Sequence, residues 1–164
     1  KYIESLYEYE ETPEVEDFMK LLMIHGNLIS NPEFKDGFNN WQIETSLEER
    51  QYTLGKDGVF ISSDANFDYS ISQTVDIEYT GEYIAAVEYR GTNTTGVEVE
   101  LFMDVEDESG VHTYTSDIFP ADVRFVTHLL KPVRLQKNAR VTVGLRMHTP
   151  PVFAKIKKIS LVVI

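Results

Sequence analysis

Alternation of apolar and polar residues with a period of two is the feature that most constrains how this chain can fold. Three stretches carry it, at 83–90, 97–106 and 141–148. Successive side chains of a β-strand point to opposite faces, so this period predicts strands that bury one face. The predicted inward residues are Tyr83, Ala85, Val87 and Tyr89, then Val97, Val99, Leu101, Met103 and Val105, then Val141, Val143, Leu145 and Met147.

Shorter patterns of the same kind predict further strands at 58–63, 69–77, 111–119, 123–135 and 152–163. Turn sequences separate them, among them Gly55-Lys56-Asp57-Gly58 and Asp107-Glu108-Ser109-Gly110. No helical pattern lies between the strands, which argues against parallel βαβ units. We therefore predict an all-β fold, an antiparallel β-sandwich of the jelly-roll kind with about nine or ten strands.

The first 25 residues have a different character. They are strongly acidic, and Thr12 and Pro13 suit the start of a helix that Gly26 ends. A short helix at about 13–25 would place Val15, Phe18, Met19, Leu22 and Met23 near one face, packed against the following domain. A Met-rich helix that binds a partner is the alternative. The predicted organisation is an acidic lead-in or linker with a short helix (1–25), followed by a β-sandwich (26–164).

The charge and composition exclude several classes of function. Acidic residues number 27 against 15 basic ones, a formal net charge of -12, which disfavours nucleic acids and anionic membrane surfaces as partners. The absence of cysteine excludes thiol catalysis and thiolate metal sites. No apolar run approaches the roughly 20 residues that span a bilayer. Both ends are expected to continue in a longer protein.

Two segments carry a family resemblance. Residues 27–41 read NLISNPEFKDGFNNW, and the last predicted strand contains FAKIKKISLVV. They match the opening and closing motifs of jelly-roll carbohydrate-binding modules of the galactose-binding-like superfamily. The matching positions are Asn27, Leu28, Asn31, Pro32, Phe34, Gly37 and Trp41, then Ile156, Ile159, Ser160 and Leu161. Residues 27–164 thus resemble these modules, with an overall likeness to those appended to endo-β-1,4-galactanases, and the resemblance places Trp41 in the core.

Two observations bear on calcium, the one cofactor left open. In many of the resembling modules a Glu and an Asp help hold a structural calcium ion, and the corresponding positions here carry Lys35 and Lys157 or Lys158, which cannot ligate it. Separately, Asp64, Asn66 and Asp68 have the alternating oxygen spacing of a calcium loop, without its later Gly and Glu. An Asx-rich turn explains these three residues equally well.

Candidate sugar-binding residues lie on the outward faces of the predicted strands and in one loop. Sugars are bound by aromatic faces together with planar polar groups that pair with hydroxyls. The residues that offer these groups are Glu88, Arg90, Phe102, Tyr114, Arg146, His148 and, near a loop edge, Tyr52. The alternative is a solvated sheet face with ordinary cross-strand ion pairs, such as Glu98 or Glu100 beside an Arg.

No catalytic motif stands out. The four histidines are dispersed, and neither a nucleophile elbow nor a phosphate-binding loop occurs. The alternating carboxylates Asp104, Glu106 and Glu108 are similar to those of some jelly-roll glycosidases, but a solvated strand end explains them better. We therefore expect no enzymatic activity.

The resemblance implies a non-catalytic module that binds a polysaccharide or oligosaccharide. The expected ligand is a soluble or gel-like β-linked plant polysaccharide, such as β-1,4-galactan, xylan or β-glucan. The expected setting is extracellular, with a glycoside hydrolase catalytic domain on the same parent chain and with neither nucleic acid nor membrane as partner. The alternative is a structural or protein-interaction β-sandwich of a secreted or surface protein.

Overall fold

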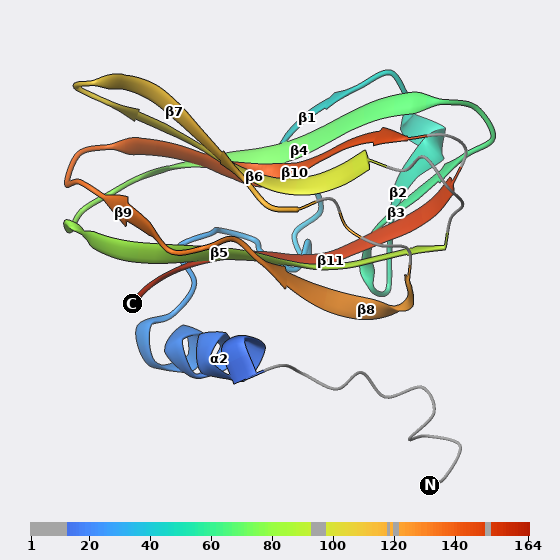
Figure 1. Cartoon of the computed structure of the whole chain (residues 1–164). Coiled ribbons are helices and arrows are strands. Elements are labelled where there is room, and N and C mark those ends of the chain that lie inside the picture. Colours follow the sequence, from blue (N-terminus) through green and yellow to red (C-terminus); the bar gives the residue numbers. More distant parts are fainter. Residues whose placement is uncertain (1–12, 93–97, 118, 120–121, 150–151) are drawn as a thin grey trace, which may run out of the picture.

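Two antiparallel β-sheets stack face to face, and helix α2 (Pro13–His25) lies beneath one of them (Figure 1). The structure, a computed structural model, describes residues 13–92, 98–117, 119, 122–149 and 152–164, so residues 1–12 of the expected lead-in lie outside it. The predicted β-sandwich with a short helix before it is confirmed.

The upper layer in Figure 1, here sheet A, has five strands. Their spatial order is β1 (Gln42–Thr45), β4 (Phe67–Asp76), β10 (Arg140–Thr149), β6 (Glu98–Asp107) and β7 (Gly110–Thr115). Strand β10 pairs with both β4 and β6, so its outward residues have neighbours on two sides.

The lower layer, sheet B, has six strands. The order is β2 (Tyr52–Gly55), β3 (Gly58–Ser63), β11 (Val152–Val163), β5 (Gly81–Thr92) and β8 (Asp122–Leu129), while β9 (Val133–Leu135) also pairs with β5. A short 3-10 helix, Glu49–Gln51, precedes β2. The last strand in chain order, β11, therefore lies between β3 and β5.

The strands differ from the prediction in three main places. The strand predicted at 111–119 ends at Thr115, as β7. The predicted strand at 123–135 is split into β8 and β9 around Lys131-Pro132, because proline has no N–H for a ladder hydrogen bond. Strands β1 and β2 were not predicted, since four residues each are too few to display a period of two.

The core lies between the sheets and follows the predicted alternation. Every described residue of the three predicted inward faces is buried, and all belong to one hydrophobic cluster. Val97 lies outside the described residues. Burial of each large side chain contributes roughly 1.5–3 kcal/mol, so these faces dominate the stability of the sandwich.

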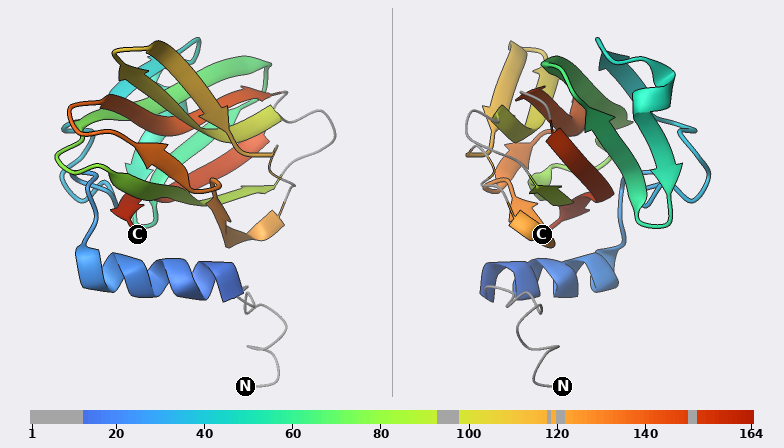
Figure 2. Two further views of the ribbon diagram at one scale, coloured as in Figure 1. Left: turned by 60° about the vertical axis from the view of Figure 1, so that its left-hand side comes forward. Right: turned by 90° about the vertical axis from the view of Figure 1, so that its right-hand side faces the viewer.

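Helix α2 (Pro13–His25) covers part of the outer face of sheet B (Figure 2). Phe18 is buried against Ala86 of β5 and Val162 of β11, which confirms the predicted helix that packs on the domain. The prediction was wrong for Met23, which is 86% exposed. Five residues separate it from Phe18, and at about 100° per residue this turns its side chain roughly 140° away.

The opening segment folds around the side chain of Asn31. Its Nδ2 donates to the carbonyl oxygens of Gly37 and Asn39 (both 3.0 Å), and its Oδ1 accepts from the N–H of Asp36 (2.9 Å). Trp41 donates from Nε1 to the carbonyl of Asn31 (2.9 Å), and its ring lies 4.9 Å from that of Phe34. Trp41 is buried in the core, as expected.

Asn27 attaches this segment to the final strand. Its Oδ1 accepts hydrogen bonds from the N–H groups of Ile29 (3.0 Å) and Leu161 (3.1 Å). Its Nδ2 donates to Ser160 Oγ (3.1 Å). The backbone adds bonds from Leu28 N to Leu161 O and from Ile159 N to Pro32 O. The two motifs that carry the family resemblance are therefore in direct contact.

None of the described helices is long and apolar enough to cross a membrane.

Candidate functional site

A groove with a volume of about 580 Å³ lies on the outer face of sheet A. Strands β1, β4, β6 and β10 and the residue after β1 supply its walls and floor. It is lined by Glu44, Thr45, Ser46, Asp68, Tyr69, Ser70, Glu98, Glu100, Arg146, Met147 and His148.

Strand register brings the charged side chains of the groove together. On β10, Arg146 lies opposite Glu100 of β6 and Ser70 of β4. Two residues further along β10, His148 lies opposite Glu98 and Asp68. Directly opposed residues of antiparallel strands share one face, so two rows of polar groups cross three neighbouring strands.

Arg146 lies above Phe102 and covers it. Its guanidinium carbon is 4.2 Å from the centroid of the Phe102 ring, and its Nε is 3.2 Å from Glu100 Oε1. The Phe102 ring is only 5% exposed, whereas the Arg146 side chain is 40% exposed. A ligand in the groove would therefore meet the planar guanidinium group rather than the aromatic ring.

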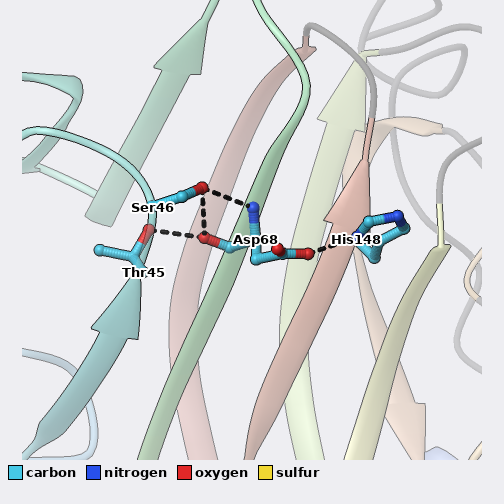
Figure 3. Close-up of polar contacts among 4 residues, drawn as sticks. All are labelled: Thr45, Ser46, Asp68 and His148. Carbon is cyan, nitrogen blue, oxygen red and sulfur yellow. Dashed lines mark hydrogen bonds and ion pairs between the residues drawn. The ribbon is translucent and has the colours of Figure 1, made fainter.

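His148 pairs with Asp68, which β1 holds in place (Figure 3). Thr45 Oγ1 donates to the backbone carbonyl of Asp68 (2.6 Å), and Ser46 Oγ accepts from its N–H (2.9 Å). His148 Nδ1 bonds to Asp68 Oδ1, and this hydrogen bond to a carboxylate raises the pKa of His148. Acidification thus favours a charged imidazole beside Asp68.

Carboxylates dominate the electrostatics of the groove. Glu44, Asp68, Glu98 and Glu100 face one guanidinium group, that of Arg146, and one imidazole, that of His148. Carboxylates and guanidinium groups can each bridge two neighbouring hydroxyls with paired hydrogen bonds. The groove therefore suits a ligand rich in hydroxyl groups and repels one that carries negative charge.

The structure brings only part of the predicted sugar-binding set to this groove. Arg146 and His148 line it, and Phe102 lies beneath Arg146. Arg90 and Glu88 are on β5, on the outer face of the other sheet. Tyr114 lies opposite the inward-facing Met103, and Tyr52 packs against Phe38 and Tyr69.

The seven residues therefore do not form one site, and a role for each in sugar binding remains a prediction. The pairing of Arg146 with Glu100 is the cross-strand ion pair that the alternative interpretation expects.

Sequence reasoning missed four residues of the groove: Glu44, Thr45, Ser46 and Ser70. The first three lie on or directly after the short strand β1, which no pattern predicts, and Ser70 pairs with Glu44 across the ladder. The sequence places Asp68 only in a candidate calcium loop, because a separation of 80 positions along the chain hides its contact with His148.

The proposed calcium loop has a different set of contacts. Asp64 and Asn66 are exposed, and the Asp68 carboxylate bonds to His148. Among the described residues, no group of three or more His, Asp or Glu side chains is arranged to hold a metal ion. Calcium at Asp64, Asn66 and Asp68 stays a prediction. Of the lysines expected at the calcium positions of the resembling modules, Lys35 and Lys157 have their Nζ atoms 3.7 Å from Glu33 and 4.0 Å from Glu88, and Lys158 is the alternative to Lys157.

Solved structures with the same architecture are numerous, whereas no protein-family model and no curated protein sequence matches the chain. TmCBM61, solved with β-1,4-galactotriose, has a TM-score of 0.63 at 15% identity and covers 84% of this chain and 99% of its own. The enzymatically active domain of tailspike protein 4 from bacteriophage CBA120 has a TM-score of 0.60 at 14% identity, covering 84% of this chain and 21% of its own. The CBM22-1 xylan-binding domain of Paenibacillus barcinonensis Xyn10C has a TM-score of 0.53 at 10% identity, with coverage of 85% and 95%. At these identities the likeness shows the fold.

Proposed function

We propose that this chain is a non-catalytic carbohydrate-binding module whose ligand lies in the groove on sheet A. The observation that carries the proposal is the crossing of Arg146, His148 and their carboxylate partners over three strands of one open sheet face. Such a row offers paired hydrogen bonds to successive hydroxyl groups.

The charge of the groove favours a neutral polysaccharide. Four carboxylates against one guanidinium group would repel a polymer that carries uronic acids or sulfates. β-1,4-Galactan, xylan and β-glucan are neutral and rich in hydroxyls. The galactotriose bound to TmCBM61 and the xylan bound by the Paenibacillus domain, both with the same fold, support the choice of these polymers.

The wider setting follows from the same proposal. A module of this kind would hold a catalytic domain of its parent chain near an extracellular polysaccharide, which raises the local substrate concentration. The structural neighbours named as binding modules support this setting.

A structural or protein-interaction sandwich is the second candidate, and one observation favours it. Among the described residues at the groove, none presents an exposed aromatic ring, because Arg146 covers Phe102 and Tyr69 is 1% exposed. A polar face of this kind also suits a spacer or a docking surface.

Affinity electrophoresis against soluble galactan, xylan, β-glucan and polygalacturonate tests the proposal, with and without EDTA. The chain is expected to be retarded by a neutral polymer, and the variant Arg146→Ala is expected to migrate freely. Arg140→Ala is the matched control, because Arg140 is on the same strand and pairs with Asp76 outside the groove.

Loss of retardation in EDTA would show that binding requires a metal ion and would support calcium at Asp64, Asn66 and Asp68. Free migration on every polymer, in both conditions, would reject the module and leave the structural sandwich.

A further inference from the structure

The outer face of sheet B that α2 leaves uncovered carries aromatic and cationic side chains together. Six residues make up this aromatic–cationic face: Phe60, Arg90, Phe125, Phe153, Lys155 and Lys157. Strand register sets the row, because Lys155 of β11 lies opposite Phe60 of β3 and Arg90 of β5. Arg90 shares its side of β5 with Ala86, which α2 buries, so the row looks away from the core and from sheet A.

Contacts between rings and cations run along the face. Phe60 and Phe153 are stacked with ring centroids 6.0 Å apart, and Lys155 Nζ lies 5.8 Å from the Phe60 centroid. Lys157 Nζ and the guanidinium carbon of Arg90 lie 5.2 and 5.7 Å from the Phe125 centroid. The face therefore consists of two neighbouring groups, each of which combines aromatic and cationic side chains.

The face is open to a ligand. Phe153 is 58% exposed, and the Lys155 and Lys157 side chains are 31% and 43% exposed. Stacking on Phe60 covers only part of the Phe153 ring, and exposed aromatic surface shared by neighbouring residues commonly marks an interaction site.

The charge of the face is opposite to that of the groove and of the whole chain. Three cations stand against two carboxylates, Asp57 and Glu88, which lie 3.9 Å from Lys155 Nζ and 4.0 Å from Lys157 Nζ. Both distances are at the long limit of an ion pair, so the carboxylates neutralise the lysines only loosely. In a chain of net charge -12, this is a surface to which an anion can come close.

We propose that the aromatic–cationic face binds a carboxylate-bearing polysaccharide. One sugar ring of the polymer would pack on Phe153, and carboxylates of the polymer would pair with Lys155, Arg90 and Lys157. An aromatic ring takes the C–H side of a sugar, and cations spaced along a strand match a polymer that repeats its charge. The choice of a glycan rests on the proposed function.

An acidic peptide is a weaker match. Extended peptides add to exposed sheet edges through main-chain hydrogen bonds, whereas β3, β11 and β5 are interior strands that offer only side chains. The chain would then hold a neutral polymer on one sheet and an acidic polymer on the other.

Calorimetric titration at low ionic strength tests this proposal with three probes: a short oligogalacturonate, its methyl ester and polyglutamate. The ester keeps the sugar and removes the charge. We expect the oligogalacturonate to bind, the ester to bind more weakly, and the affinity to fall as salt screens the charges.

Two variants localise the binding. Phe153→Ala, which removes one ring contact, and the double variant Lys155→Gln with Lys157→Gln, which removes two exposed charge contacts, are each expected to lower the affinity about tenfold. Tyr79→Ala and Lys35→Gln are the matched controls, because both residues are well exposed and lie away from the face. Arg146→Ala is expected to leave oligogalacturonate binding unchanged.

Three results would overturn the proposal: no binding of the oligogalacturonate, loss of binding only in Arg146→Ala, or polyglutamate binding of equal strength through the same residues. The neutral polymers report separately on the groove. If the neutral polymers do not bind but the oligogalacturonate does, the neutral ligand proposed for the groove is rejected and the acidic ligand proposed for the aromatic–cationic face is retained.

Discussion

The guanidinium carbon of Arg146 lies 4.2 Å from the centroid of the Phe102 ring, and Phe102 is almost fully buried. The same side chain lies next to Glu100 on the neighbouring strand. Arg146 therefore contacts both Phe102 beneath the groove and Glu100 on its charged side, so substitutions at Arg146 test the groove most directly.

Arg146→Ala is expected to lower affinity for a neutral polysaccharide by at least tenfold, since a paired contact to hydroxyls is lost. The free energy of unfolding should fall by only about 1 kcal/mol, the size of an exposed cation–π contact. Calorimetric titration and chemical denaturation measure the two effects. Equal losses of affinity in Arg146→Ala and Arg140→Ala would show that the groove is not the site.

Asp68→Asn is expected to lower the pKa of His148, because the hydrogen bond to the Asp68 carboxylate is the main cause of its rise. Proton NMR titration of the imidazole signals measures this directly, with His25 as an internal reference outside the groove. The raised pKa means that the pairing stabilises the fold below the ordinary pKa and is lost as the pH rises through the raised value. An unchanged His148 titration in Asp68→Asn would contradict this pairing.

His128 provides a pH dependence of the opposite sign. Its ring stacks on Phe119 with centroids 3.7 Å apart, and burial lowers its pKa from 6.5 to about 4. The unfolded chain binds a proton in that window and the folded chain does not, so stability is lost as the pH falls from 6.5 towards 4.

His128→Phe keeps a ring on Phe119 and removes the titration. We expect the variant to lose less stability than the unchanged protein when the pH falls through this window. Because the His128 ring is partly exposed, the difference in the free energy of unfolding, followed by thermal unfolding, should be at most about 2 kcal/mol. Parallel curves for the two proteins across the window would rule out a contribution from His128.

Asn27→Ala is expected to destabilise the sandwich by about 2 kcal/mol, because hydrogen-bonding groups of Ile29, Ser160 and Leu161 lose their partner. Chemical denaturation measures the change. Asn39→Ala is the control, since Asn39 is exposed and its bonds in the turn come from its backbone, whose N–H donates to Asp36 O and whose carbonyl accepts from Asn31. A similar loss in both variants would mean that the contact with β11 adds little.

The strands and their buried faces could be read from the sequence because alternation is a local signal. Val141, Val143, Leu145 and Met147 are predicted inward and are all buried. Alternation does not say to which sheet a strand belongs. Arg90 and Arg146 are both outward, yet β5 and β10 lie in different sheets, so the two residues face opposite sides of the molecule.

The groove depended on contacts that no local pattern contains. Asp68 and His148 meet only because β4 and β10 pair, and Glu44 reaches the site on a strand of four residues. Individual exposed polar residues can be predicted from the sequence, but which of them lie together depends on the order of the strands in the sheet.

The position of β11 bears on how the chain is completed during synthesis. Among the described strands, β11 is the last to leave the ribosome, and it pairs with β3 on one side and β5 on the other in sheet B. Until it emerges, both strands keep an unpaired edge, and Asn27 has no partner in Leu161. We therefore expect the sandwich to close only after translation of β11, with the nascent chain exposed to proteases and chaperones until then.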